Sequence, residues 1–197
     1  MLYLNMVRSW GLLVFTWLVF GVSLVQAREL PEAAGDYADP DMPGVRVRVF
    51  VHEPKMQNRI QQILTCDDVD SNSVVGKTEW HLPNNVTYRL NIASTPLNLP
   101  VIASEGFKAW ASASGNKVNF ERGANTSVNR SKMDNQNVIA WGRTNGTALG
   151  VTYTRYYTST GLVADVDTIM NNKFVLGWAY ACNPNYYDAQ NILTHEL

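Results

Sequence analysis

The sequence is organised around its last twelve residues, Tyr186-Tyr187-Asp188-Ala189-Gln190-Asn191-Ile192-Leu193-Thr194-His195-Glu196-Leu197. We expect a helix here, because Asp188 stands where an N-cap or first-turn acid stabilises one. His195 and Glu196 match the first half of an H-E-x-x-H motif. In that motif, two histidines four residues apart lie on one helix face and bind one Zn²⁺, and the glutamate is a general base. The second histidine would follow Leu197, so we expect the motif to be cut off at this point.

Length and composition favour one globular domain with a leader. The chain has 197 residues, of which 46% are hydrophobic and 17% are charged, enough to bury a core. Lys and Arg number 16 against 17 Asp and Glu, and no basic cluster is dense enough to follow a phosphate backbone. We therefore expect that the protein does not bind nucleic acid; we also expect it to be a monomer.

The N-terminus has the order of a secretory signal peptide. Arg8 precedes an apolar run from Trp10 to Val25, and the small residue Ala27 follows. This order predicts a signal peptide over residues 1–27, a secreted mature protein, and no stable membrane association after cleavage. The alternative is an uncleaved single anchor, since the run approaches the ~20 residues that span a bilayer.

Residues 28–79 are interpreted as a linker and an N-terminal extension or short pro-segment. Residues 28–44 are rich in Pro, Gly, Ala and Asp, which predicts a linker with little structure of its own. Residues 45–51 alternate apolar and basic side chains, the pattern of a short half-buried strand. Residues 56–64 have apolar side chains at helical spacing and predict a short helix.

From residue 80 onward the patterns predict an α/β fold with one mixed sheet. The helix expected over residues 101–113 would bury Phe107 and Trp110 and end at Gly115-Asn116. Residues 171–184 are expected to be a loop before the last helix. The strands are expected, with a hairpin turn at 158–161, over residues 86–92, 118–122, 138–142, 149–157 and 162–170.

In this order, the sequence resembles the matrixin-like branch of the metzincin zinc endopeptidases. The resemblance implies the upper subdomain of a zincin-like catalytic domain over residues 80–197: a twisted five-stranded sheet backed by two helices, with the lower subdomain missing. The pieces that carry it are Trp80 ahead of Val86-Thr87-Tyr88-Arg89-Leu90, Glu105-Gly106-Phe107-Lys108-Ala109-Trp110-Ala111, Val118-Asn119-Phe120, Ala148-Leu149-Gly150-Val151-Thr152-Tyr153, Ala164-Asp165-Val166-Asp167-Thr168-Ile169 and Asn191-Ile192-Leu193-Thr194-His195-Glu196-Leu197.

The resemblance also implies roles for individual residues. His195 would be the first zinc ligand and Glu196 the general base of peptide-bond hydrolysis. Protein or peptide substrates would bind by β-augmentation along an exposed edge strand. The backbone groups of that strand would come from Leu149, Gly150, Val151, Thr152 and Tyr153.

The sequence departs from the family pattern because it lacks several of the residues that hold the catalytic zinc. The chain stops before the second and third metal ligands and before the methionine turn. We therefore expect this polypeptide to be inactive by itself, with the function belonging to the full-length parent. The other histidines, His52 and His81, are not at ligand spacing to His195. The structural zinc of the vertebrate enzymes thus has no evident ligands, which points to a simpler, microbial-type relative.

The two cysteines, Cys66 and Cys182, have three readings. Export makes them candidates for a disulfide, although a free pair fits an even count equally well. Cys66 also lies near the place where matrixins keep the thiol that plugs the zinc of the latent enzyme. It lacks the Pro-Arg before and the Gly after that such a switch shows. We favour a Cys66–Cys182 disulfide, which would stabilise the fold by roughly 2–4 kcal/mol.

Two acidic residues on the strand predicted over residues 162–170 are candidate ligands of a second metal ion. Asp165 and Asp167 alternate on a predicted strand and could help bind Ca²⁺, although solvent-facing acids are the favoured reading.

The rival to an endopeptidase is a non-catalytic secreted binding or adhesion module. Its aromatic contact surface would consist of Tyr153, Tyr156, Tyr157 and Trp178.

Overall fold

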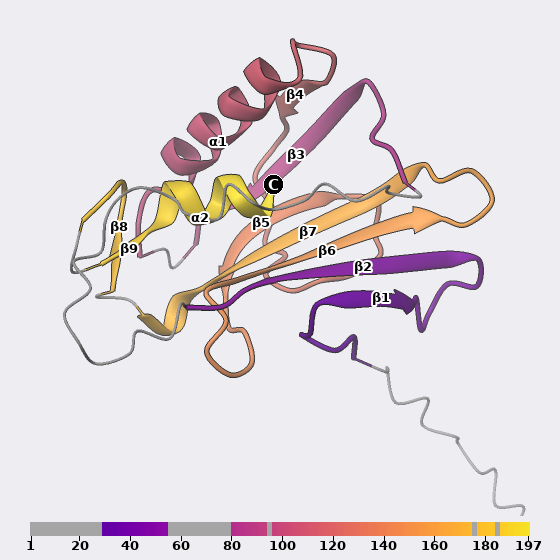
Figure 1. Ribbon diagram of the computed structural model, residues 1–197, viewed down its shortest axis with the longest axis horizontal. Coiled ribbons are helices and arrows are strands. Elements are labelled where there is room, and N and C mark those ends of the chain that lie inside the picture. The colour runs from indigo at the N-terminus through magenta and orange to yellow at the C-terminus, as the bar shows by residue number, and fades with distance from the viewer. Residues whose placement is uncertain (1–28, 55–79, 94–95, 175–176, 184–185) are drawn as a thin grey trace, which may run out of the picture.

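The computed structural model describes residues 29–54, 80–93, 96–174, 177–183 and 186–197. Within these residues the fold is mixed α/β, with a seven-stranded mixed sheet and two α-helices (Figure 1). The signal peptide predicted over residues 1–27, the helix predicted over 56–64 and Cys66 lie outside the described residues. No helix in the described part of the chain is long and apolar enough to cross a membrane.

All five strands predicted after residue 80 form, and they are neighbours in the sheet in the order β6-β7-β5-β3-β4. β4, β3, β5 and β7 run parallel to one another, whereas β6 is antiparallel to β7. The parallel pairing of β3 with β4 requires a long crossover connection, which a helix supplies. The strands are β3 (Asn85–Asn91), β4 (Asn119–Arg122), β5 (Asn137–Gly142), β6 (Gly150–Tyr157) and β7 (Val163–Asn171).

The predicted count of five strands is too low, because the N-terminal extension belongs to the same sheet. β1 (Gly35–Ala38) lies inside the interval predicted as a linker, and β2 (Val45–His52) is the predicted period-2 strand. Both extend the sheet beside β6, giving the order β1-β2-β6-β7-β5-β3-β4. The valines at alternate positions of β2 form an apolar face that must be buried, and they pack with Val151 and Tyr153 of β6.

The helix predicted over residues 101–113 is α1 (Leu99–Ala113), which ends before Gly115 and Asn116, both at positive φ. Phe107 is buried as predicted. The prediction that Trp110 is buried is wrong, since its side chain is 41% exposed. Trp110 instead lies beside the second helix, and its indole Nε1 donates a hydrogen bond of 2.7 Å to the carbonyl of Thr194.

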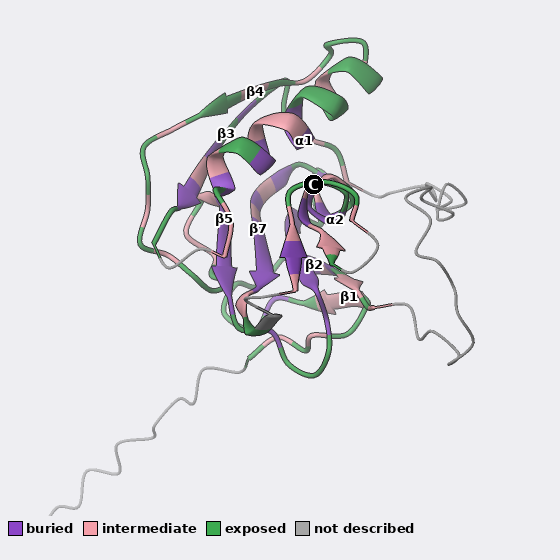
Figure 2. Ribbon diagram, turned by 90° about the vertical axis from the view of Figure 1, so that its left-hand side faces the viewer, coloured by how far each residue is buried: buried purple, intermediate pink, exposed green. Residues whose placement is uncertain are grey.

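The second helix, α2 (Ala189–Glu196), packs against α1 on one side of the sheet (Figure 1). The two helices approach closely at Gly106, where a Cβ would lie 3.0 Å from the side chain of Leu197 and 3.2 Å from that of Thr194. Figure 2 shows that buried residues occur both in the strands of the sheet and in the two helices. The resulting core consists of Tyr88, Leu90, Leu99, Ile102, Ala103, Phe107, Ile139, Trp141, Leu149, Met170, Trp178, Ala189, Ile192 and Leu193.

The interval predicted as a loop before α2 contains short structured pieces. Asn172–Phe174 forms a single 3₁₀ turn, and β8 (Trp178–Ala179) pairs in parallel with β9 (Tyr187–Asp188). The indole of Trp178 packs in the core and donates a hydrogen bond of 3.0 Å to the carbonyl of Asn171. These contacts position the start of α2 relative to the end of β7.

The opposite face of the sheet holds a buried charge cluster, which makes the prediction of solvent-facing acids at Asp165 and Asp167 wrong. Their side chains are 0% and 1% exposed. The guanidinium of Arg155, on the neighbouring strand β6, lies 3.2 Å from Asp165 and 3.1 Å from Asp167. It also lies 3.1 Å from Asp39, in the segment between β1 and β2. The carboxylates that were candidate Ca²⁺ ligands are therefore ion-paired with Arg155.

Burial of these acids should make stability depend on pH. Desolvation, together with the Asp165 carboxylate, raises the pKa of Asp167 to about 8. Between the ordinary pKa near 4 and this value, the folded chain keeps a proton that the unfolded chain has released. The free energy of unfolding should therefore fall as pH rises through this window, and Asp167 by itself contributes up to about 1.4 kcal/mol per pH unit to the slope.

Asp167→Asn should make this slope shallower, because the substituted amide does not titrate, while the slope that comes from the raised pKa of Glu196 remains. The measurement is the free energy of unfolding in urea at intervals from pH 4 to pH 8. Asp41→Asn removes an exposed carboxylate and is the matched control, which should keep the wild-type slope. An Asp167→Asn variant with an unchanged slope would show that another group carries the titration.

Candidate metal site

Helix α2 places the two motif residues at its C-terminal end. The predicted N-cap is confirmed, since the Asp188 side chain accepts a hydrogen bond of 2.9 Å from the backbone N–H of Asn191. Ile192 and Leu193 are buried in the core, so one face of the helix is anchored on the sheet. This orientation leaves His195 exposed and turns Glu196 inward.

Glu196 is a buried carboxylate without a hydrogen-bond partner on either side-chain oxygen among the described residues. It is 3% exposed and lies over Gly150, where a Cβ would come within 3.1 Å of the Glu196 Cγ. Burial raises the pKa of Glu196 to about 7, and the nearby hydroxyl of Thr152 acts in the opposite direction. Desolvated carboxylates with raised pKa values are a recognised feature of functional sites.

The end of α2 is held on the sheet by a chain of two hydroxyl groups. The Thr152 hydroxyl donates a hydrogen bond of 2.9 Å to the backbone carbonyl of Glu196. The Thr168 hydroxyl lies 2.9 Å from the Thr152 hydroxyl. Because Thr152 already donates its proton to the Glu196 carbonyl, Thr168 is the donor of this second hydrogen bond and the Thr152 oxygen accepts it. Carbonyls in the last turn of a helix have no partner within the helix, so this bond satisfies a group that would otherwise be orphaned.

A third metal-ligating side chain, His52, joins His195 and Glu196. One potential ligand atom from each of the three residues lies within 4.8 Å of the others. The two imidazole rings are 5.0 Å apart between centroids and nearly perpendicular, at 89°. His52 is the last residue of β2 and lies opposite Gly150 in the register of β2 and β6. The expectation that His52 has no useful spacing to His195 is therefore wrong, because strand pairing joins positions far apart in the chain.

The predicted edge strand is an interior strand. Residues 149–153 are buried, and β6 pairs with β7 on one side and with β2 on the other. The register of β2 on β6 runs from Val45 opposite Tyr157 to His52 opposite Gly150. In the present arrangement, the backbone groups expected to bind a substrate are used by the chain's own N-terminal extension.

The predicted disulfide between Cys66 and Cys182 can be checked at one of its two cysteines. Cys182 is disulfide-bonded, while Cys66 lies outside the described residues, so their pairing stays a prediction.

Of the proposed aromatic contact surface, Tyr153, Tyr156 and Trp178 are buried, and Tyr157 alone is exposed. The rival interpretation as an aromatic binding module therefore loses most of its stated surface.

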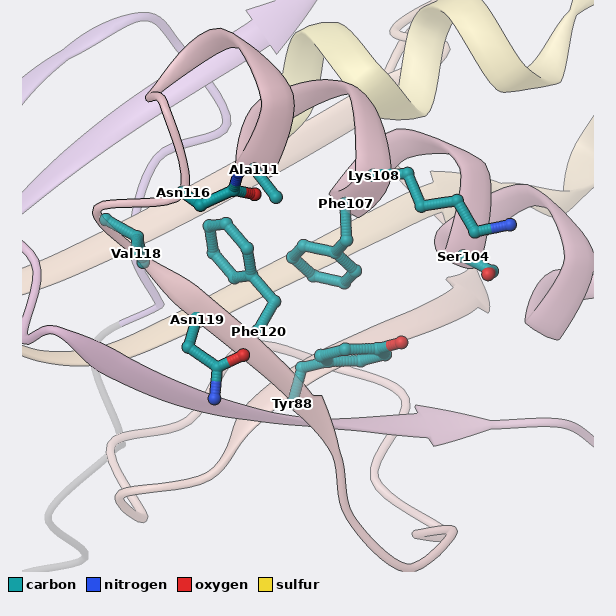
Figure 3. Close-up of a pocket in the computed structure, with 9 residues that line it drawn as sticks. All are labelled: Tyr88, Ser104, Phe107, Lys108, Ala111, Asn116, Val118, Asn119 and Phe120. Atoms are coloured by element: carbon teal, nitrogen blue, oxygen red, sulfur yellow. The ribbon is translucent and has the colours of Figure 1, made fainter.

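A surface pocket of about 220 Å³ lies elsewhere, between α1 and strands β3 and β4 (Figure 3). Its aromatic residues contact one another: the rings of Tyr88 and Phe107 are 4.0 Å apart, and those of Phe107 and Phe120 are 4.8 Å apart. The described residues that line it include no histidine, cysteine or acid. Among the described residues, the side chains that could hold a metal ion therefore lie at the His52–His195–Glu196 cluster and not at this pocket.

Comparison of the chain with protein-family models, with curated proteins and with solved structures found no significant match. Any function of this chain has therefore to be inferred from the residues of the site itself.

The hydroxyl chain can be tested by Thr152→Val, which keeps the shape of the side chain and removes its hydroxyl. The buried carbonyl of Glu196 and the hydroxyl of Thr168 would each lose a partner. The free energy of unfolding should fall by about 1–3 kcal/mol. Thr154→Val is the matched control, because Thr154 is buried on the same strand and its hydroxyl forms no hydrogen bond with a described residue. Equal losses for both variants in urea unfolding would contradict the role of the Thr152 bond.

Proposed function

We propose that this chain carries the first metal ligand and the general base of a secreted zinc-dependent endopeptidase. The observation that supports this best is the buried carboxylate of Glu196, without a side-chain partner among the described residues, next to the exposed imidazole of His195. A buried polar group is normally hydrogen-bonded, so an orphaned one at the end of a helix calls for an explanation. A metal site with an acid–base group beside it is such an explanation.

The architecture is consistent with this proposal. Strands β3 to β7 form a continuous block of five strands, and α1 and α2 pack on one side of it. This is the arrangement that the resemblance to the matrixin-like metzincins leads one to expect of a zincin-like upper subdomain. The remaining ligands of the motif would follow Leu197 in the full-length gene product.

The residues present suit the chemistry of peptide hydrolysis. His195 offers an imidazole that faces solvent, and imidazole is a common zinc ligand. Bound Zn²⁺ supplies a water of lowered pKa and polarises the scissile carbonyl. Glu196, with a pKa raised to about 7 by burial, is poised to accept a proton near neutral pH and to return it to the leaving amine.

Protein or peptide substrates are part of this proposal, but residues 149–153 do not offer them a strand edge, because β6 pairs with β2 on one side and with β7 on the other. Export through the predicted signal peptide is part of the same proposal.

The experiment uses the full-length gene product and its Glu196→Gln variant. We expect about one zinc per chain by elemental analysis and chelator-sensitive cleavage of casein. Glu196→Gln should lower kcat/KM by about 10²–10⁴-fold, the usual contribution of a general acid–base group. The matched control is Glu105→Gln, which neutralises an exposed glutamate of α1 and should leave cleavage unchanged. A folded, zinc-free and inert wild-type product would contradict the proposal.

A further inference from the structure

We infer that His52 is a metal ligand, and that His52, His195 and Glu196 form a transition-metal site that joins the N-terminal strand β2 to helix α2. The resemblance to a known family does not supply this ligand, because His52 lies in the N-terminal extension. The site needs no proteolytic activity, and it uses only residues that the chain already contains.

The donor set matches the chemistry of zinc. Two imidazoles and one carboxylate are a ligand combination that zinc uses in known sites, and a fourth position remains for water. Donor atoms around a tetrahedral zinc lie about 3.4 Å apart, given metal–ligand bonds of about 2.1 Å. The three donors here lie within 4.8 Å of one another, so small side-chain rotations would close the site. His195 is exposed and has room for such a rotation.

Glu196 supplies an independent reason to place a cation here. Its carboxylate is 3% exposed, and neither oxygen accepts a hydrogen bond from a described residue. A cation between this carboxylate and the two imidazoles would compensate the cost of burying the charged form. Gly150 has no side chain to fill the space over which the Glu196 side chain lies, so the carboxylate keeps its place beside His52.

The sheet holds His52 in place before any metal binds. All eight residues of β2 pair with β6, and Val45, Val47 and Val49 are buried on the face opposite to His52. A slip of one residue would expose these valines and turn His52 to the other face. The ligand is therefore pre-positioned, and metal binding does not have to order the strand that carries it.

The site has a consequence for the proposed endopeptidase, and this step rests on that proposed function. A catalytic zinc needs an open coordination position for water or substrate. With His52 and Glu196 both bound to the metal, the N-terminal extension would occupy a coordination position, and the carboxylate proposed as general base would be held as a ligand. The arrangement described here would be a latent one.

The test is a calorimetric titration of the purified 197-residue chain with Zn²⁺. We expect one site per chain, and we expect His52→Ala to weaken the affinity by at least about 10- to 100-fold, the loss that even an outer-shell partner causes. His81→Ala is the matched control, because His81 is exposed and is not part of the cluster. This variant should bind Zn²⁺ like the wild type.

Folding is checked by the melting temperature without metal. If His52→Ala is destabilised, His52→Gln replaces it, since glutamine keeps a polar side chain at the end of β2. Wild-type affinity in a folded His52 variant would overturn the inference, as would a wild-type chain that binds no Zn²⁺. Neither result depends on cleavage. A zinc-dependent full-length protease whose His52 variants bind Zn²⁺ normally would refute the role of His52 and leave the proposed function intact.

Discussion

The pairing of β2 with β6 is the constraint on which the rest of the site depends. The alternate valines of β2 must be buried, and they find their partners on the face of β6 that carries Val151 and Tyr153. Because side chains alternate along a strand, burying this face turns the other set of β2 side chains toward α2. His52 belongs to that set, and the register sets it opposite Gly150. A purely apolar contact on one face of the sheet thus positions an imidazole on the other.

Helix α2 is docked from two directions, and this docking accounts for the burial of Glu196. From the sheet, the hydroxyl of Thr152 bonds to the carbonyl of Glu196. From α1, the indole of Trp110 bonds to the carbonyl of Thr194, and Gly106 permits the close approach of the two helices. The carboxylate of Glu196 is desolvated because its backbone is held, and not because its side chain gains a partner among the described residues. Packing elsewhere in the core therefore supports a side chain that is unfavourable in isolation.

The buried acids on the two faces of the sheet differ in whether their carboxyl groups have interaction partners. On the face away from the helices, Asp165 and Asp167 are paired with Arg155, and Asp167 also accepts a hydrogen bond from the backbone N–H of Lys132. On the helix face, Glu196 has neither a cation nor a donor within the described residues. The pairing of Asp165 and Asp167 with Arg155 gives these acids a structural role. Glu196, without such a partner among the described residues and beside two imidazoles, is a candidate to bind a ligand. This contrast distinguishes Glu196 from the other buried acids as a candidate functional residue.

The sequence by itself determined the local features of this protein. The five strands after residue 80, helix α1, the Asp188 cap of α2 and the adjacent His195 and Glu196 all follow from short-range patterns, because periodicity and capping act over a few residues. Tertiary structure alone decided that β2 covers β6, that Asp165 and Asp167 are buried, and that His52 meets His195. Those outcomes depend on which strands become neighbours, and a strand's own residues show that it needs a partner without showing which one.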